Sequence, residues 1–277
     1  MHKCLECRPF KQNPAKETVI TMEKTVIGII GGSGLDNPDI METPRDEKVT
    51  TPYGDPSSEL KHGCIGGREV VLLARHGREH TIPPTQVNYR ANIMALKTAG
   101  CTHIIATTAV GSLREEIDRG HLVIIDQFID FTKQRKMSFY DSFEPHKPIH
   151  VPMADPYDNY LRKLLIDECR VLRYPFHEKG TVVTIEGPRF STRAESFMFR
   201  ALGADIINMS VATETVLANE AGIPYAAVAM STDYDCWRSG EESVTWEAVL
   251  KVFSENASRV TNLLRRIIPK INQAPAG

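Results

Sequence analysis

The stretch TVIGIIGGSG at residues 25–34 decides the fold of this chain. Its first seven residues form a nearly continuous apolar run, rich in β-branched residues, and three glycines around Ser33 follow. A continuous run of this kind, without apolar–polar alternation, is typical of a strand that is covered on both faces. The stretch therefore predicts a buried parallel strand that ends in a tight, glycine-rich turn.

Similar short apolar runs recur along the chain. They are VVLLARH at 70–76, HIIATTA at 103–109, HLVIIDQ at 121–127, GTVVTIE at 180–186, ADIINMS at 204–210 and YAAVAMST at 225–232. Longer segments with apolar residues at helical spacing lie between several of them, and a helical segment at 246–268 follows the last. This alternation predicts an α/β fold with a largely parallel sheet, helices on both of its faces and no internal repeat.

Composition and charge exclude several classes of protein. Apolar residues make up 42% of the 277 residues, and Lys+Arg 33 against Asp+Glu 35 gives a net charge of −2. We therefore expect neither a nucleic-acid nor a membrane partner. No apolar run approaches the roughly 18 residues of a membrane helix, and the N-terminus lacks a signal-peptide core, so we expect a cytoplasmic protein. We expect residues 1–24 to form a polar N-terminal extension and residues 25–277 to form a single domain.

Cysteine usage gives no sign of a disulfide framework or a metal centre. Six cysteines are too few for a disulfide scaffold in a chain of this length. Only Cys4 and Cys7 form a CxxC, and the second pair that a zinc site needs is absent. We expect no metal and no cofactor.

Hydroxyl and cationic side chains gather where the predicted strands end. The carboxyl ends of parallel strands share one edge of a sheet, so these side chains are expected to converge. A guanidinium is well suited to phosphate, and hydroxyls add neutral donors. A turn of glycines alone could equally be structural, but four donor-bearing strand ends predict a phosphate site, built from Ser33, Arg75, Thr108 and Ser210 with His76 beside them.

Common nucleotide-binding, catalytic and metal-binding motifs fit these residues less well. The glycine-rich turn is neither GxGxxG, because residue 37 is Asn, nor a Walker loop, nor GxSxG. His76 and His80 have the HxxxH spacing of a metal site on a helix, but Gly77, Pro83 and Pro84 favour a loop.

The pair Asp233 and Asp235 is compatible with two kinds of chemistry and with a role that involves no chemistry. A DxD can hold the metal of a sugar-nucleotide transferase, or a carboxyl with a raised pKa can share a proton with a ring nitrogen. A solvated acidic turn is the third possibility. Further metal ligands are lacking at the strand ends, which favours the heterocycle.

Taken in order, the longest motifs resemble the 5′-methylthioadenosine phosphorylase branch of the trimeric purine nucleoside phosphorylase family. The likeness covers residues 25–268 and is carried by GIIGGSGL, ARHGREHTIPP, NYRANI, TTAVGSLREE, IIDQFID, EGPRFSTRAE and TDYDCW. It implies a single α/β domain of the nucleoside phosphorylase type, with a mixed, mostly parallel and partly barrel-like central sheet flanked by helices. It also implies a homotrimer with active sites near the subunit interfaces.

The resemblance assigns roles to individual residues. Its phosphate-binding positions are Ser33, Arg75, His76, Thr108, Ala109 and Ser210. Met209 falls at the ribose, and Phe190, Ser191, Asp233 and Asp235 fall around the base, with Asp233 catalytic. The 5′ pocket takes in Val244, Trp246, Val249 and Leu250, and His150 aligns with a histidine that the family lends to the neighbouring subunit.

The implied reaction is phosphorolysis of 5′-methylthioadenosine to adenine and 5-methylthioribose 1-phosphate, a pentosyltransferase reaction of purine and methionine salvage. Phosphate is a co-substrate and itself the nucleophile, so no activated Ser or Cys is required. Where the 6-oxopurine branch has an Asn, this chain has Asp233, whose carboxylate suits the amino group of adenine. The alternative is a purine nucleoside phosphorylase acting on adenosine, inosine or guanosine. The metal-dependent transferase and a nucleoside-binding relative without turnover also stay open.

Several positions depart from the family pattern. The family's usual VPE is here Val211-Ala212-Thr213-Glu214, and Ser210 stands for the family's Thr. Trp246 replaces a small aliphatic residue, and the chain ends at Gly277, before the family's last helix. The last two departures concern the pocket for the 5′ group of the nucleoside. The resemblance therefore defines the 5′ substituent less well than the other parts of the substrate.

Overall fold

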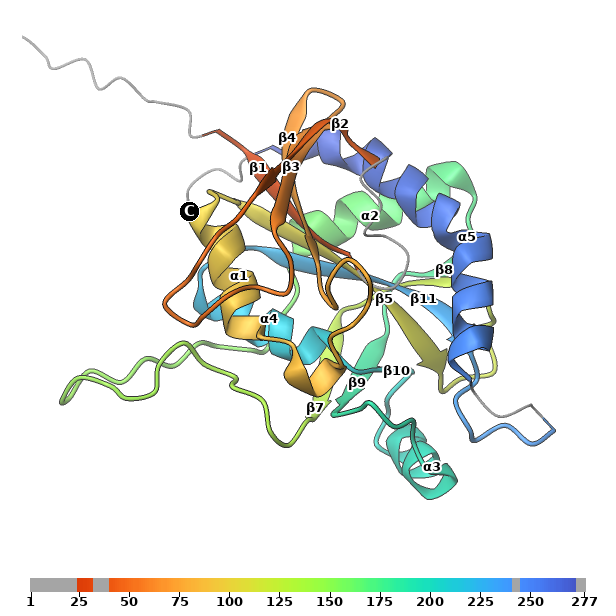
Figure 1. Cartoon of the computed structure of the whole chain (residues 1–277). Helices are drawn as coiled ribbons and strands as arrows, with labels where there is room; N and C mark the ends of the chain where they lie inside the picture. The colour runs from red at the N-terminus through yellow and green to blue at the C-terminus, as the bar shows by residue number, and fades with distance from the viewer. Residues whose placement is uncertain (1–23, 32–39, 241–244, 273–277) are drawn as a thin grey trace, which may run out of the picture.

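The computed structural model describes residues 24–31, 40–240 and 245–272 (Figure 1). Apart from Lys24, the polar extension expected at 1–24, with Cys4 and Cys7, lies outside the described residues. The strands are β1 (Val26–Gly31), β2 (Glu42–Glu47), β3 (Leu60–Ile65), β4 (Arg68–Ala74), β5 (His103–Ser112), β6 (Leu122–Ile124), β7 (Gln127–Phe131), β8 (Phe176–His177), β9 (Thr181–Ile185), β10 (Ile206–Asn208) and β11 (Tyr225–Asp233). The helices are α1 (Tyr89–Thr98), α2 (Asn159–Leu172), α3 (Arg193–Ala201), α4 (Val211–Glu220) and α5 (Trp246–Ile267), with short 3₁₀ turns at Pro84–Gln86 and Ile268–Lys270.

All described strands belong to one mixed sheet, which forks at β5. The main path runs β2-β3-β4-β1-β5-β10-β9-β7, while β11 pairs with β5 and continues to β6 and β8. Six pairings are parallel and four antiparallel, so the expectation of a mixed, mostly parallel sheet is confirmed. Within the described part of the chain these pairings leave the sheet open.

Helices cover both faces of the sheet, as the alternation of elements predicts. On one face, α1 and α4 pack on side chains such as Ile30 and Ala227. On the other face, α2 and α5 pack on Ile29 and Val228. Neighbouring residues of one strand point to opposite faces, and here both faces are apolar. This explains why the strand runs are continuous in the sequence.

Side-chain caps fix the starts of four helices. Asn88, Asp158 and Thr245 accept hydrogen bonds from the first turns of α1, α2 and α5, and Thr192 with Glu195 forms a capping box at α3. Helix α4 differs, because Ser210 at its N-cap makes no capping hydrogen bond. Its hydroxyl is therefore not engaged in capping the helix.

The structure adds strands that the sequence analysis did not expect. Strand β2 is polar and fully exposed, and β3 contains the buried His62 and Gly63. Strand β2 lies at the edge of the sheet, where a strand does not need the apolar run of an interior strand, whereas β3 pairs with both β2 and β4. The run at 121–127 is divided between β6 and β7, which pair with different strands.

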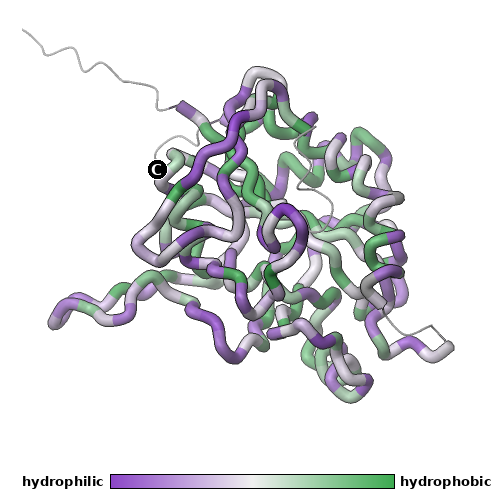
Figure 2. The backbone as a smooth tube through the Cα atoms, in the orientation of Figure 1, coloured by the Kyte–Doolittle hydropathy of each residue, from purple (hydrophilic) through white to green (hydrophobic). Residues whose placement is uncertain are grey.

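One long segment leaves the body of the molecule. Residues 132–158 connect β7 to α2 and extend outward, in green at the lower left of Figure 1. The green, apolar parts of the tube in Figure 2 concentrate in the interior strands. Tyr140, Phe143 and Ile149 are nevertheless exposed on the projecting segment.

Candidate active site

A pocket opens where β5 changes partners. On one edge, β5 pairs with β11 from Ile104 to Gly111. On the other edge, its pairing with β1 ends at Ala106, and its pairing with β10 begins only at Gly111. Residues 107–110 thus have no strand beside them on that edge among the described residues. Thr108–Gly111 line a pocket whose empty space of about 790 Å³ includes open solvent.

Arg75 follows β4 and lies almost completely buried in the wall of this pocket. Its Nε and Nη2 donate to the two carboxylate oxygens of Glu214, the second over 2.9 Å, and its Nη1 donates to the carbonyl of Thr107 over 3.0 Å. Burial by itself would lower the pKa of Arg75, but the charge and hydrogen bonds of Glu214 outweigh this and raise it. Arg75 therefore remains a cation in the pocket wall.

His76 lines the same pocket in a neutral form. Its Nδ1 lies 2.9 Å from the carbonyl oxygen of Ile82, which can only accept, so Nδ1 carries the proton and Nε2 offers a lone pair. Burial, followed by the nearby charges of Arg75, His80 and Arg135, lowers the pKa of His76 to about 4, although the bond to Ile82 acts in the other direction. Its ring centroid lies 4.5 Å from that of His80, in the loop after β4 rather than on a helix.

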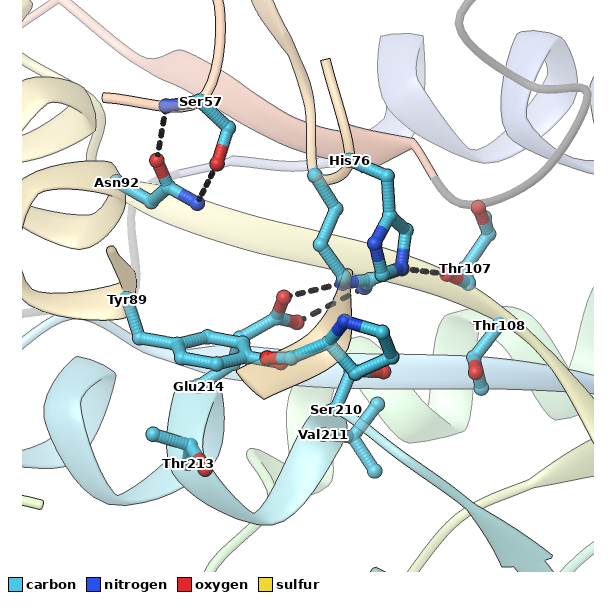
Figure 3. Close-up of polar contacts among 12 residues, drawn as sticks. Ser57, His76, Tyr89, Asn92, Thr107, Thr108, Ser210, Val211, Thr213 and Glu214 are labelled. Carbon is cyan, nitrogen blue, oxygen red and sulfur yellow. Dashed lines mark hydrogen bonds and ion pairs between the residues drawn. The ribbon is translucent and has the colours of Figure 1, made fainter. Parts of the chain in front are cut away.

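Ser210 brings the N-terminus of α4 to the pocket. The helix begins at Val211, so backbone N–H groups and the positive end of the helix dipole lie beside a hydroxyl that makes no cap. Asn208 holds this region together, because its Nδ2 donates to Thr108 Oγ1 over 3.2 Å while its Oδ1 accepts from Thr184 over 2.8 Å. These contacts tie β10 to β5 and β9, and Figure 3 shows Thr108 and Ser210 near His76.

Asp233 is the last residue of β11 and lines the pocket, where its carboxylate oxygens accept hydrogen bonds from neighbouring residues. Its Oδ2 accepts from Thr232 Oγ1 over 2.8 Å, and its Oδ1 accepts from the backbone N–H of Asp235 over 2.7 Å. Burial raises the pKa of Asp233 to about 6, and the charge of Asp235 acts in the same direction against these two hydrogen bonds. Asp233 can thus hold a proton close to neutral pH.

Asp235 is buried and lines the pocket next to Asp233. Burial raises the pKa of Asp235, and the nearby hydroxyls of Ser196 and Ser191 limit this rise. The adjacent Cys236 approaches the carbonyl of Ser191 through its Sγ at 3.4 Å. The loop before α3 and the end of β11 therefore meet at this part of the pocket.

Apolar side chains complete the walls. Met209, Phe190 and Val249, all expected from the sequence, line the pocket together with Ile185 and Ile207. The side chain of Phe190 is 41% exposed, so it lies at the mouth. An apolar wall next to a few polar groups is the usual composition of a small-molecule site.

The structure does not bring every expected residue to the pocket. Ser33 and Val244 lie outside the described residues, and the side chain of Trp246 is not described. Leu250 is 37% exposed on α5 and is not part of the pocket wall. His150 is exposed on the projecting segment, where its ring faces Phe143 at a centroid distance of 6.0 Å.

Three structurally important residues were missed by the sequence analysis. Asn208 carries no motif of its own, and Glu214 was noted only as the last residue of the segment that stands for the family's VPE; both act through neighbouring side chains. Gly111 lies so close to Asp233 that a Cβ there would stand 2.9 Å from Asp233 Oδ1. Gly111 lies two residues beyond the run expected at 103–109, and a glycine next to such a run was the one available signal, since a glycine in a strand often marks a close approach.

Within residues 24–31, 40–240 and 245–272, no three side chains among His, Cys, Asp and Glu are grouped to hold a metal ion. None of the helices in this part of the chain is long and apolar enough to cross a membrane.

Comparison with known proteins gives a consistent result. The sequence pattern of the phosphorylase superfamily matches residues 26–269. S-methyl-5′-thioadenosine phosphorylase of Danio rerio is 55% identical over 250 residues, covering 89% of each chain. The protein of the same name from Thermofilum pendens is 52% identical over 252 residues, covering 90% of this chain and 94% of its own.

Among solved structures, methylthioadenosine phosphorylase from Schistosoma mansoni in complex with adenine superposes with a TM-score of 0.85. It is 43% identical, and the match covers 89% of this chain and 92% of that one. The same enzyme in complex with tubercidin gives a TM-score of 0.81 at 42% identity, with the same coverage of both chains. The chain therefore belongs to the phosphorylase superfamily and, within it, to the family of the S-methyl-5′-thioadenosine phosphorylases.

Proposed function

We propose that this chain catalyses the phosphorolysis of 5′-methylthioadenosine to adenine and 5-methylthioribose 1-phosphate. One observation carries the proposal: a single pocket holds both the buried cation Arg75 and the carboxyl of Asp233, whose pKa is raised to about 6. The first suits an anionic nucleophile and the second suits a leaving base. The relatives named above carry this activity in their names.

In this proposal phosphate binds beside Arg75, His76, Thr108, Ala109 and Ser210. A phosphate oxygen attacks C1′ of the ribose, and the bond from C1′ to N9 of the purine breaks. The sugar passes through a cationic transition state, which the adjacent phosphate stabilises. Phosphate is a co-substrate, and the proposed chemistry requires no cofactor.

The base departs more readily when N7 receives a proton. Asp233 can supply that proton, since burial keeps part of its population protonated near neutral pH. Asp235 and Ser191 line the pocket near it and are proposed to contact the 6-amino group and the ring. An ionised carboxylate accepts hydrogen bonds, so the arrangement favours an amino group over a carbonyl at this position.

The 5′ group is proposed to lie against Val249, with Trp246 and Val244 from the same part of the chain. A buried hydroxyl without a partner costs about 1–3 kcal/mol, so an apolar wall favours methylthio over hydroxyl. Adenosine, inosine and guanosine are thus expected to be poorer substrates.

A direct assay tests the function. The protein is incubated with 5′-methylthioadenosine with and without phosphate, and adenine release is followed. We expect release only with phosphate, together with a higher kcat/KM for methylthioadenosine than for inosine. Release without phosphate, or a preference for inosine, would contradict the proposal, and loss of activity in EDTA would instead support a metal-dependent transferase.

We further propose a cytoplasmic homotrimer that acts in purine and methionine salvage. The projecting segment 132–158 exposes Tyr140, Phe143 and Ile149, and aromatic and aliphatic side chains of this kind favour contact with another subunit. His150 lies on the same segment, and we propose that it serves the 5′ pocket of the neighbouring subunit.

A further inference from the structure

Glu214 is a fully buried carboxylate that stands behind the pocket rather than in its wall. It lies in the first turn of α4 with a side-chain exposure of 0%, and Arg75, its partner, has 1%. Figure 3 shows Glu214 extending from α4 with two dashed contacts toward the guanidinium next to His76. The proposed function gives this residue no role of its own.

The contacts of Glu214 leave Arg75 little freedom. Both carboxylate oxygens accept from Arg75, one from Nε and one from Nη2, and Oε2 also accepts from the hydroxyl of Tyr225 over 2.8 Å. Tyr225 is itself 1% exposed at the start of β11. A bidentate ion pair of this kind fixes the plane of the guanidinium as well as its position.

Three of the five N–H bonds of Arg75 are thus directed at Glu214 and Thr107. The two that remain are on Nη1 and Nη2, so their directions are set by the same plane. Arg75 lies at the end of β4, and Glu214 is anchored in a helix whose N-terminus opens on the pocket. The orientation of the remaining donors is therefore determined from α4.

We propose that Glu214, supported by Tyr225, is the positioning residue of the phosphate subsite, and that it acts on phosphate only through the guanidinium of Arg75. This inference rests on the proposed function for its substrate. Without Glu214 the guanidinium would lose two of its three fixed contacts and could turn away from the anion. Phosphate would then meet a cation that is poorly oriented, although its charge is unchanged.

The chain offers a matched control. Glu168 in α2 is also buried, with a side-chain exposure of 2%, and it pairs with Arg266 and Lys270 far from the pocket. Glu168→Gln removes a buried carboxylate that is paired with cations, as Glu214→Gln does. Only the second variant is expected to change phosphate binding.

The test compares Glu214→Gln, Glu168→Gln, Arg75→Ala and the double variant Arg75→Ala/Glu214→Gln. For Glu214→Gln we expect the phosphate KM to rise by about tenfold or more, as for loss of an oriented charged contact. The methylthioadenosine KM at saturating phosphate should stay within about twofold. Glu168→Gln should leave both constants within about twofold while lowering the melting temperature.

The double variant tests whether Glu214 acts through Arg75. If it does, Glu214→Gln adds nothing to the phosphate KM once Arg75 is alanine, which is the non-additivity of a coupled pair. Equal rises in both backgrounds would overturn the inference. So would a phosphate KM in Glu214→Gln that matches the value in Glu168→Gln.

Two further measurements keep the inference testable if Glu214→Gln fails to fold or the wild type proves inactive. Tyr225→Phe removes one contact of Glu214 without a change of charge, and should raise the phosphate KM by a few-fold; an unchanged value contradicts the proposal. Calorimetric titration with inorganic phosphate measures the anion site without any nucleoside. A wild type that binds phosphate but releases no adenine refutes the proposed function, and the variants still test the role of Glu214.

Discussion

Asp233 illustrates how the surroundings of one residue decide its chemistry. The carboxyl is enclosed at the end of β11, and burial raises its pKa to about 6. In the proposed reaction its protonated form is the active one, because it delivers a proton to N7. Deprotonation with rising pH should therefore lower activity.

We expect kcat/KM for methylthioadenosine to fall as the pH rises through about 6. Asp233→Asn should reduce turnover far more than Ser191→Ala, and its residual activity should lack that descending limb. A pH–rate profile of the three proteins measures both effects. Equal, small losses in the two variants would remove Asp233 from proton transfer.

The same raised pKa has a consequence for stability. Between 3.8 and about 6 the folded protein keeps a proton on Asp233 that the unfolded chain has lost, so stability falls as the pH rises through this range. The difference corresponds to at most about 3 kcal/mol. Asp233→Asn should thus raise the melting temperature at about pH 7.5 and leave it nearly unchanged at about pH 4. An identical shift at both pH values would contradict this account.

The role proposed for Arg75 in phosphate binding can be tested by substitution. Arg75→Ala removes the cation from the pocket wall and should raise the phosphate KM by about tenfold to a hundredfold. It also leaves Glu214 buried without its cation, which costs about 3–5 kcal/mol of stability. Steady-state kinetics at varied phosphate and a thermal melt measure the two losses. An unchanged phosphate KM would place the anion elsewhere.

The order of apolar runs predicts the pocket residues that follow a strand, but it gives no signal for residues that act through other side chains. Arg75, Met209 and Asp233 each lie at or just beyond the end of a predicted strand run, so their place at one edge of the sheet follows from the pattern. Glu214 lies in the first turn of a helix, where a carboxylate is common, and nothing in its spacing indicates Arg75, 139 residues away. Such pairings depend on how α4 and β4 pack.

At the scale of elements, strand β5 determines where the pocket lies. The sequence predicted a strand at 103–109, but β5 continues to Ser112, and its extra residues pair with β10 and β11. The fork could not be predicted from the sequence, because apolar runs indicate strands without their partners. The exposed polar strand β2 was missed for a related reason, since an edge strand needs no apolar pattern.

The close approach of Gly111 in β5 to Asp233 leads to a prediction about catalysis. A Cβ at this position would lie 2.9 Å from Asp233 Oδ1 and 3.0 Å from a methyl group of Ile207, so Gly111→Ala should displace the carboxyl. We expect kcat for methylthioadenosine to fall by about tenfold or more, as for misplacement of a catalytic group.

Gly28→Ala is the control for this variant. Gly28 lies in β1 of the same sheet, and a Cβ there would crowd the apolar side chains of Ile104, Cys101 and Leu96, so the variant should cost stability without lowering kcat. Equal kcat values for the two variants would mean that the space around Asp233 is not critical.

At the scale of the whole molecule, the projecting segment 132–158 separates His150 from the pocket of its own chain. If each subunit extends this segment to its neighbour in a trimer, each active site combines Asp233 of one chain with His150 of another. Subunits of His150→Ala and Asp233→Asn, each impaired alone, should then form mixed trimers with some intact sites.

We therefore expect activity to appear when the two variants are unfolded, mixed and refolded together, and light scattering to give the mass of three chains. Refolding each variant alone is the control. Activity of the mixture equal to the mean of the two variants would show that His150 serves its own chain or no site at all.

The change of partners along β5 also has a consequence for amide hydrogen exchange. In a strand, successive N–H groups point to opposite edges, so within 107–110 those facing β11 are bonded, while those facing the gap are not bonded to a neighbouring strand of the described chain. Slow and fast exchange should thus alternate within one of the most buried strands of the molecule. Occupation of the pocket should slow only the fast set, which makes β5 itself a reporter of ligand binding.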